Sequence, residues 1–205
     1  TGRFNEAQSI LSGYARHLRN GLIPNLFDDY GGAAHYNTVD ASLWFVHAVH
    51  EAWRWRMPEV TINDPRVFDA CHEIIAAYRR GTDFGICMDD DGLIIAGDES
   101  TQLTWMDAKR DGVVFTPRCG KAVEINALWH NALMCLSRMT GDAGQRNDLF
   151  TLARRVAASF RAAFWWNDRQ CLHDCLMPGR AGQRPALQRF EPDGRLRPNQ
   201  ILAAS

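Results

Sequence analysis

The residue types best suited to chemistry gather in the run 102–109, which reads Gln-Leu-Thr-Trp-Met-Asp-Ala-Lys. Asp107 lies two residues after Trp105 and two before Lys109. A carboxyl group partly buried beside an aromatic ring keeps a raised pKa, so it can donate a proton to a leaving oxygen. Aromatic rings cover the apolar faces of sugars, and carboxylates perform acid–base steps at glycosidic bonds. Asp107 is therefore the leading candidate for a general acid; the alternative is a loop carboxylate that caps a turn or pairs with Lys109.

A second polar run leads directly into a predicted helix and contains Arg118, Lys121, Glu124 and Asn126. Each of these residues also has an ordinary structural interpretation. Glu124 falls in the first helical turn, where an acid is favourable, and the two cations can hold loops by pairing with acids. Asn126 can bind sugar hydroxyls or bridge loops, and Asp40 can cap a helix. Spacing alone does not choose between binding and bracing.

Other chemistries find little support in the sequence. Asp98 and Glu99 lie in a Gly-Asp-Glu-Ser segment that is typical of turns. There is no phosphate-binding glycine loop and no Gly-X-Ser-X-Gly nucleophile elbow. Cys171, His173 and Cys175 offer three metal ligands but no partner pair at zinc-site spacing. We therefore expect no metal and no cofactor, and we interpret the six cysteines as reduced thiols of a cytoplasmic protein.

Composition and charge narrow the class of protein. The chain has 205 residues, of which 46% are hydrophobic, enough for one domain or part of a larger one. Its 23 Lys and Arg nearly balance 24 Asp and Glu, which argues against a nucleic-acid partner. No apolar run reaches the length of a membrane span. Predicted helices begin within a few residues of Thr1 and just after residue 197, so we expect both ends to lie inside a larger fold.

The apolar periodicity predicts mainly helices. Their expected ranges are 4–20, 40–56, 64–80, 121–140 and 145–166, with a further helix after 197–200. A β-hairpin is expected near 84–96, turning at 90–92, and a strand near 170–177; 97–120 is predicted as a loop. Polar motifs precede every second helix, at residues 40, 121 and 198. This alternation indicates inner and outer helices, with the inner N-termini facing one shared polar pocket.

Several of these motifs together resemble the amylo-α-1,6-glucosidase domain of glycogen debranching enzymes. The resemblance extends along essentially the whole chain, in the same order and with similar spacing. It is carried by Gly-Leu-Ile-Pro-Asn at 21–25, Tyr-Asn-Thr-Val-Asp-Ala-Ser-Leu-Trp-Phe at 36–45, the run 102–109, Thr-Pro-Arg at 116–118, Gly-Lys-Ala-Val-Glu-Ile-Asn-Ala-Leu-Trp at 120–129 and Leu-Arg-Pro-Asn-Gln at 196–200. In this family Cys119 and His130 are usually replaced by bulky or aromatic residues.

The resemblance implies an all-α (α/α)6 toroid, of which residues 1–205 would form a single partial domain of about half the barrel. It also implies inverting hydrolysis of α-1,6 glucosyl branch points in glycogen or another branched α-glucan. Asp107 would be the general acid, and the pocket would be lined or braced by Trp105, Asp40, Arg118, Lys121, Glu124 and Asn126. The glutamate that acts as the general base in this family would lie beyond Ser205. Alone, the 205 residues are therefore expected to be inactive and to self-associate through exposed apolar helix faces.

Two other classes of function remain open at this point. One is a related toroid enzyme on another glycoside, such as a trehalase-like hydrolase or a phosphorylase, which would need a phosphate site in place of the base. The other is a glycan-binding domain without catalysis. Phosphate dependence of turnover separates the first from a debranching enzyme, and sugar binding that survives Asp107→Asn without any turnover indicates the second.

Overall fold

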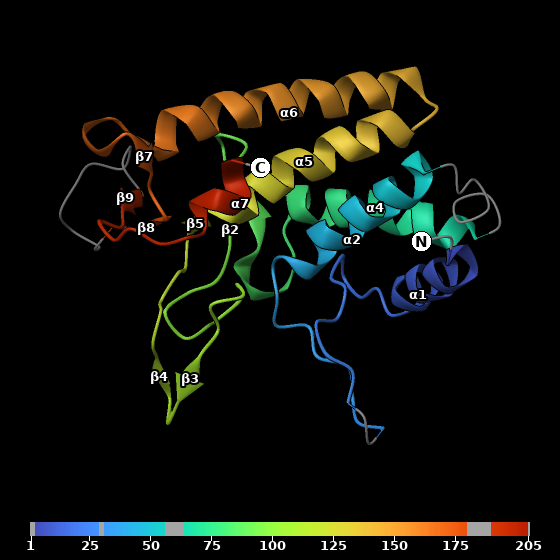
Figure 1. Cartoon of the computed structure of the whole chain (residues 1–205), viewed down its shortest axis with the longest axis horizontal. Coiled ribbons are helices and arrows are strands. Elements are labelled where there is room, and N and C mark those ends of the chain that lie inside the picture. The colour runs from blue at the N-terminus through green and yellow to red at the C-terminus, as the bar shows by residue number, and fades with distance from the viewer. Residues whose placement is uncertain (1–2, 29–30, 56–63, 180–189, 205) are drawn as a thin grey trace.

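The computed structural model describes residues 3–28, 31–55, 64–179 and 190–204 (Figure 1). Within them the chain is mostly helical, with small β-sheets. The helices are α1 (Phe4–Arg16), α2 (Ala41–Arg54), α4 (Pro65–Arg80), α5 (Val123–Met139), α6 (Ala143–Phe164) and α7 (Gln200–Ala204). The strands are β1 (Cys87–Met88), β2 (Ile94–Ile95), β3 (Lys109–Arg110), β4 (Val113–Val114), β5 (Lys121–Ala122), β6 (Trp165–Trp166), β7 (Cys171–Leu172), β8 (Cys175–Pro178) and β9 (Phe190–Pro192).

Local chemistry explains where these helices begin. Asp64 is the N-cap of α4 and accepts a hydrogen bond from the backbone N–H of Arg66, and Pro65 occupies the first turn. Asp142 caps α6 by accepting from the Gln145 N–H at 2.7 Å. The predicted Asp-Pro start of the helix at residue 64 is thereby confirmed.

The first helix is shorter than its periodicity predicts. It ends at Arg16 instead of near residue 20, because Arg19 and Leu22 exchange two backbone hydrogen bonds across Asn20 and Gly21. Both central residues have positive φ, 51° and 76°, as a tight reversing turn requires. A Cβ at Gly21 would collide with Ala77, so this turn packs directly against α4.

Helix α5 lies at the centre of the packing. Figure 1 shows α6 running along one side of it, with α2 and α4 on the other side, and α5 contacts all three as well as α7. Trp129 of α5 is fully buried and stacks on Tyr78 of α4, with ring centroids 6.0 Å apart. Aromatic pairs of this kind add to the burial of apolar area. The helix that carries Glu124 and Asn126 is therefore fixed on several sides.

In the described part of the chain, three hairpins (β1–β2, β3–β4 and β6–β7) and one three-stranded sheet accompany the helices. The predicted hairpin near 84–96 is confirmed, since β1 and β2 pair Cys87 with Ile95. The loop expected over 97–120 is interrupted by a second hairpin, in which β3 and β4 pair Lys109 with Val114; a loop over the whole range is therefore wrong. Asp111 and Gly112 form their turn, and both residues have positive φ. An Asp-Gly pair is a strong sequence signal for such a hairpin. In Figure 1 this hairpin projects away from the helices.

The three-stranded sheet joins distant parts of the chain. Its strand order is β5-β8-β9, all antiparallel, so residues 121–122 pair with 175–176 and 176–178 pair with 190–192. The strand expected near 170–177 is present as two short strands, β7 and β8, which belong to different sheets. The helix expected from 121 begins two residues later, because Lys121 and Ala122 are recruited into this sheet. The sheet thus fixes the entry to α5 against the segment that leads to α7.

None of the described helices is both long enough and apolar enough to cross a membrane.

Candidate active site

Trp105 and Asp107 lie on the loop that leads from the Ala96–Gly120 bridge into β3. The Trp105 side chain is about half exposed, and Asp107 is exposed. The partial burial expected for a general acid at Asp107 is therefore not found among the residues that the structure describes. Within the described part of the chain, no hydrogen bond or ion pair engages the Asp107 carboxylate. A backbone bond from the Val39 N–H to the Leu103 carbonyl, 2.9 Å long, ties the loop to the residues before α2. The loop is thus anchored at Leu103, while the side chains of Trp105 and Asp107 are exposed to solvent.

The indole of Trp105 is held from the start of α7. Its Nε1–H donates to Oδ1 of Asn199 at 2.8 Å, and the two residues are 94 positions apart. The same Asn199 amide donates from Nδ2 to Oδ1 of Asp174 at 2.7 Å and contacts the sulfur of Met106 at 3.4 Å. The two motifs at 102–109 and 196–200 are therefore in direct contact, which their separation in sequence does not reveal.

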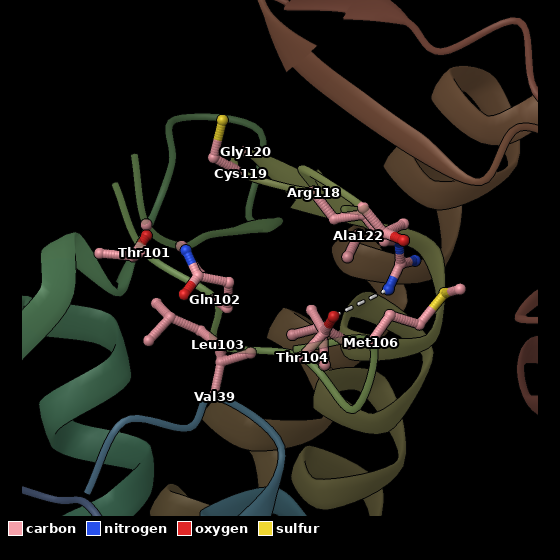
Figure 2. A pocket seen from close by; sticks show the side chains of 14 residues that line it. Val39, Thr101, Gln102, Leu103, Thr104, Met106, Arg118, Cys119, Gly120 and Ala122 are labelled. Atoms are coloured by element: carbon pink, nitrogen blue, oxygen red, sulfur yellow. Dashed lines mark hydrogen bonds between the residues drawn. The ribbon is translucent and has the colours of Figure 1, made fainter. Parts of the chain in front are cut away.

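Beneath this loop Arg118 is the hub of a buried ionic cluster. Its Nε lies 2.8 Å from Oδ2 of Asp174, and its two terminal nitrogens donate to both carboxylate oxygens of Glu124. The three side chains are only 1–2% exposed. Arg118 also donates to the Thr104 hydroxyl at 3.2 Å, the dashed contact in Figure 2. Burial alone would lower the pKa of Arg118, but the bound carboxylates outweigh it and raise that pKa.

A second guanidinium extends the cluster. Arg197 donates to Oδ2 of Asp174 at 2.8 Å and to Oδ2 of Asp193 at 2.6 Å. Asp174 is thus bound by two arginines and an amide. No role was predicted from the sequence for Asp174, Asp193, Arg197 or Asn199. The Arg-Pro-Asn-Gln motif at 197–200 could have pointed to Arg197 and Asn199. No sequence pattern marks Asp174, apart from its position between Cys171 and Cys175.

Lys121 and Asn126 brace the first hairpin. The ammonium of Lys121 lies 2.8 Å from Asp89 and 2.6 Å from Asp91, and it sits over the ring of Phe190. Asn126 is fully buried and bonds both backbone groups of Ile94, accepting from its N–H at 2.6 Å and donating to its carbonyl at 3.1 Å. A third bond joins Asn126 to the Ala122 carbonyl. Both side chains therefore have their polar atoms engaged by the protein itself.

Asp40 lies apart from the Arg118 cluster. It precedes α2 and accepts from the Thr38 hydroxyl at 2.5 Å, although its side chain makes no capping bond. It lines a separate apolar hollow of about 380 Å³ between α1 and α2, together with Trp44 and Tyr14. The structure therefore brings together Trp105, Arg118 and Glu124, and it places Lys121 and Asn126 at the adjoining hairpin.

The N-termini of the three motif-led helices converge on this loop. A pocket beside it is lined by Val39 before α2, by Ala122 and Ile125 at the start of α5, and by Leu103 and other loop residues (Figure 2). The start of α7 reaches the same loop through Asn199. The pocket's free volume is only about 10 Å³, room for about one water molecule. A ligand larger than a water molecule does not fit into this pocket.

In the part of the chain that the structure describes, no group of three or more His, Cys, Asp or Glu side chains is placed to hold a metal ion. All six cysteines are free. The exposed Asp107 carboxylate on the anchored loop is a group of the kind that can take part in acid–base steps.

Comparison with known proteins decides the family. Residues 1–205 match the amylo-alpha-1,6-glucosidase family from end to end. The chain belongs to this family. The glycogen debranching enzyme of the yeast Saccharomyces cerevisiae is 29% identical over 187 aligned positions, which cover 65% of this chain. The alignment spans 12% of that enzyme's length, so the chain corresponds to a small part of its yeast relative. The resemblance noted from the motifs is thereby confirmed.

Proposed function

We propose that this chain takes part in removing α-1,6-linked glucosyl units from glycogen or a similar branched α-glucan, with Asp107 as the general acid. The observation that carries this proposal is the placement of Asp107. It is exposed, two residues from a half-exposed tryptophan, on a loop anchored to a buried ionic cluster. Protonation of the glycosidic oxygen by Asp107 would let the glucosyl unit leave as charge develops on its ring.

Trp105 would cover the apolar face of the glucose. Its side chain is about half exposed, whereas its N–H is already bound by Asn199. Arg118 and Glu124 would brace the loop from below, and Lys121 and Asn126 would fix the neighbouring hairpin. Asp40 would contribute from the separate hollow that it lines between α1 and α2.

Inverting hydrolysis needs a second carboxylate about 6.5–9.5 Å from the acid, with a water between them. We propose that a glutamate outside these 205 residues is this base, within an (α/α)6 toroid of which the present helices form about half. The isolated chain would then be inactive, and it would self-associate through apolar side chains exposed on α1 and α2, such as Ile10 and Trp44. The branched-glucan substrate and the six free thiols support a cytoplasmic setting.

The stereochemistry of the product tests this proposal. The full-length protein is mixed with a glucan whose branches have been trimmed to single α-1,6-linked glucosyl stubs, and the first product is followed by proton NMR. We expect β-glucose before mutarotation, at a rate independent of added phosphate. A glucose phosphate that appears only with phosphate would indicate a phosphorylase. Glucan binding without any released sugar would indicate a binding domain.

A further inference from the structure

The Asn199 amide has one permitted orientation in this structure. The indole N–H of Trp105 can only donate, so it faces the amide oxygen. The Asp174 carboxylate can only accept from it, so it faces the amide nitrogen. A side chain at 199 must therefore donate and accept at once. Neither Leu nor Asp can satisfy both neighbours.

A buried ionic cluster holds the Asn199 side chain in place. Asp174 and Asn199 are each about 1% exposed, and Asp174 is bound from its other oxygen by Arg118 and Arg197, both at 2.8 Å. Charge-assisted bonds of this kind are short and directional. The position of Asn199 is consequently set by the buried cluster rather than by the solvent-exposed loop that it contacts.

Asn199 contacts the two residues that immediately precede Asp107. It holds the indole of Trp105 through Oδ1 and touches Met106 through Nδ2. Two further contacts that tie this loop to the rest of the fold lie earlier in the chain, at the Leu103 carbonyl and the Thr104 hydroxyl. On the side before Asp107, Asn199 is thus the nearest described anchor to the carboxylate; on the other side, the Ala108 carbonyl accepts from the Phe115 N–H at 3.1 Å within the β3–β4 hairpin.

We infer that Asn199, oriented by Asp174, is a positioning residue that sets the indole of Trp105 and, through the adjoining backbone, the carboxylate of Asp107. This inference rests on the proposed function for its catalytic consequence. A displacement of about 1 Å in a reacting group can cost about a hundredfold in rate. Asn199 itself has both ends of its amide engaged by the protein, so it acts through Trp105.

A double-mutant cycle in the full-length protein tests the inference. Asn199→Leu, Trp105→Phe and the double variant are compared for glucose release, with rates normalised to the folded fraction. Phe keeps a ring but removes the N–H donor. Each single change should lower kcat about ten- to a hundredfold with KM altered less than about threefold. The double variant should fall little below the poorer single variant, because both changes break one interaction. Multiplied losses would overturn the inference.

Gln200→Ala is the matched control. Gln200 begins the same helix and accepts from the Leu172 N–H at 3.2 Å, with no contact to Trp105 among the described hydrogen bonds. Its effect should multiply with that of Trp105→Phe. A merely structural role for the helix start would instead make Asn199→Leu and Gln200→Ala behave alike.

A readout independent of turnover separates this inference from the proposed function. Backbone hydrogen exchange of the peptide covering 102–108 is measured for the wild type, Asn199→Leu and Gln200→Ala. Faster exchange in Asn199→Leu alone supports the positioning role even when the wild type releases no glucose. Equal exchange in all three proteins would overturn it, whatever the substrate.

Discussion

Arg118 and Asp174 are 56 residues apart in the chain, yet their side chains meet at 2.8 Å in the core. Their contact joins the segment before α5 to the segment between β7 and β8. The candidate catalytic loop rests on this junction through Thr104 and Asn199. The stability of the cluster and the geometry of the loop are therefore linked.

Replacing the hub of the cluster should be costly. Arg118→Met leaves Glu124 buried without its cation and removes one of two arginines from Asp174. Breaking a buried ion pair in this way costs about 3–5 kcal/mol of unfolding free energy. Urea unfolding measures the change. Arg110→Met, at a site whose side chain is 82% exposed and pairs with exposed Asp111, should change stability by less than about 1 kcal/mol; similar losses for both variants would contradict this account.

The buried amide of Asn126 should matter for stability rather than for contact with sugar. Asn126→Leu leaves the N–H and carbonyl of Ile94 without their side-chain partner in a dry site. Each unsatisfied buried group costs about 1–3 kcal/mol, so the midpoint of thermal unfolding should fall clearly. Asn147→Ala, on the exposed face of α6, is the control and should shift stability by at most about 0.5 kcal/mol. An unchanged midpoint for Asn126→Leu would refute the bracing role.

Sequence patterns predicted most of the helices because apolar spacing and caps such as Asp64-Pro65 are local signals. They also singled out Trp105, Asp107 and Arg118. What they could not supply were partners far away in the chain, namely Asp174 and Asn199. A buried carboxylate between two cysteines has no local signature, since its role arises only when β8 pairs with β5. The second hairpin had a local signal in Asp111-Gly112, which its polar surroundings obscured.

The backbone conformation just before β5 and α5 requires a glycine at position 120. Its φ is +103°, and a Cβ there would collide with the carbonyl oxygen of Leu176 in the neighbouring strand. Gly120→Ala should therefore destabilise the fold by about 2–4 kcal/mol, as measured by chemical denaturation. Gly141→Ala has open space around it and should be tolerated within about 1 kcal/mol. Equal tolerance of both substitutions would mean that the β5–β8 approach is not this close.

His173 should make stability depend on pH. Its ring stacks on Trp166, and its Nδ1 is buried without a hydrogen-bond partner among the described residues. Burial lowers the pKa of His173 below its ordinary value of 6.5. The folded state then binds fewer protons than the unfolded state, so stability is full above about pH 6.5 and falls as the pH drops toward the lowered pKa.

The variant His173→Phe keeps a ring on Trp166 but removes the titrating group. Its unfolding temperature should decline less than that of the wild type between pH 7 and pH 5. Parallel declines in the two proteins would show that His173 does not contribute to the acid sensitivity.

The most direct test of the central claim is the rate of glucose release by Asp107→Asn in the full-length protein, on a glucan bearing single α-1,6-linked glucosyl stubs. Asp111→Asn is the matched control, since Asp111 is an exposed acid four residues away, in the β3–β4 turn. Loss of the general acid should lower kcat about 10²–10⁴-fold with the fold intact, while Asp111→Asn keeps the wild-type rate. Equal rates for Asp107→Asn and the wild type would contradict the assignment of Asp107 as the acid.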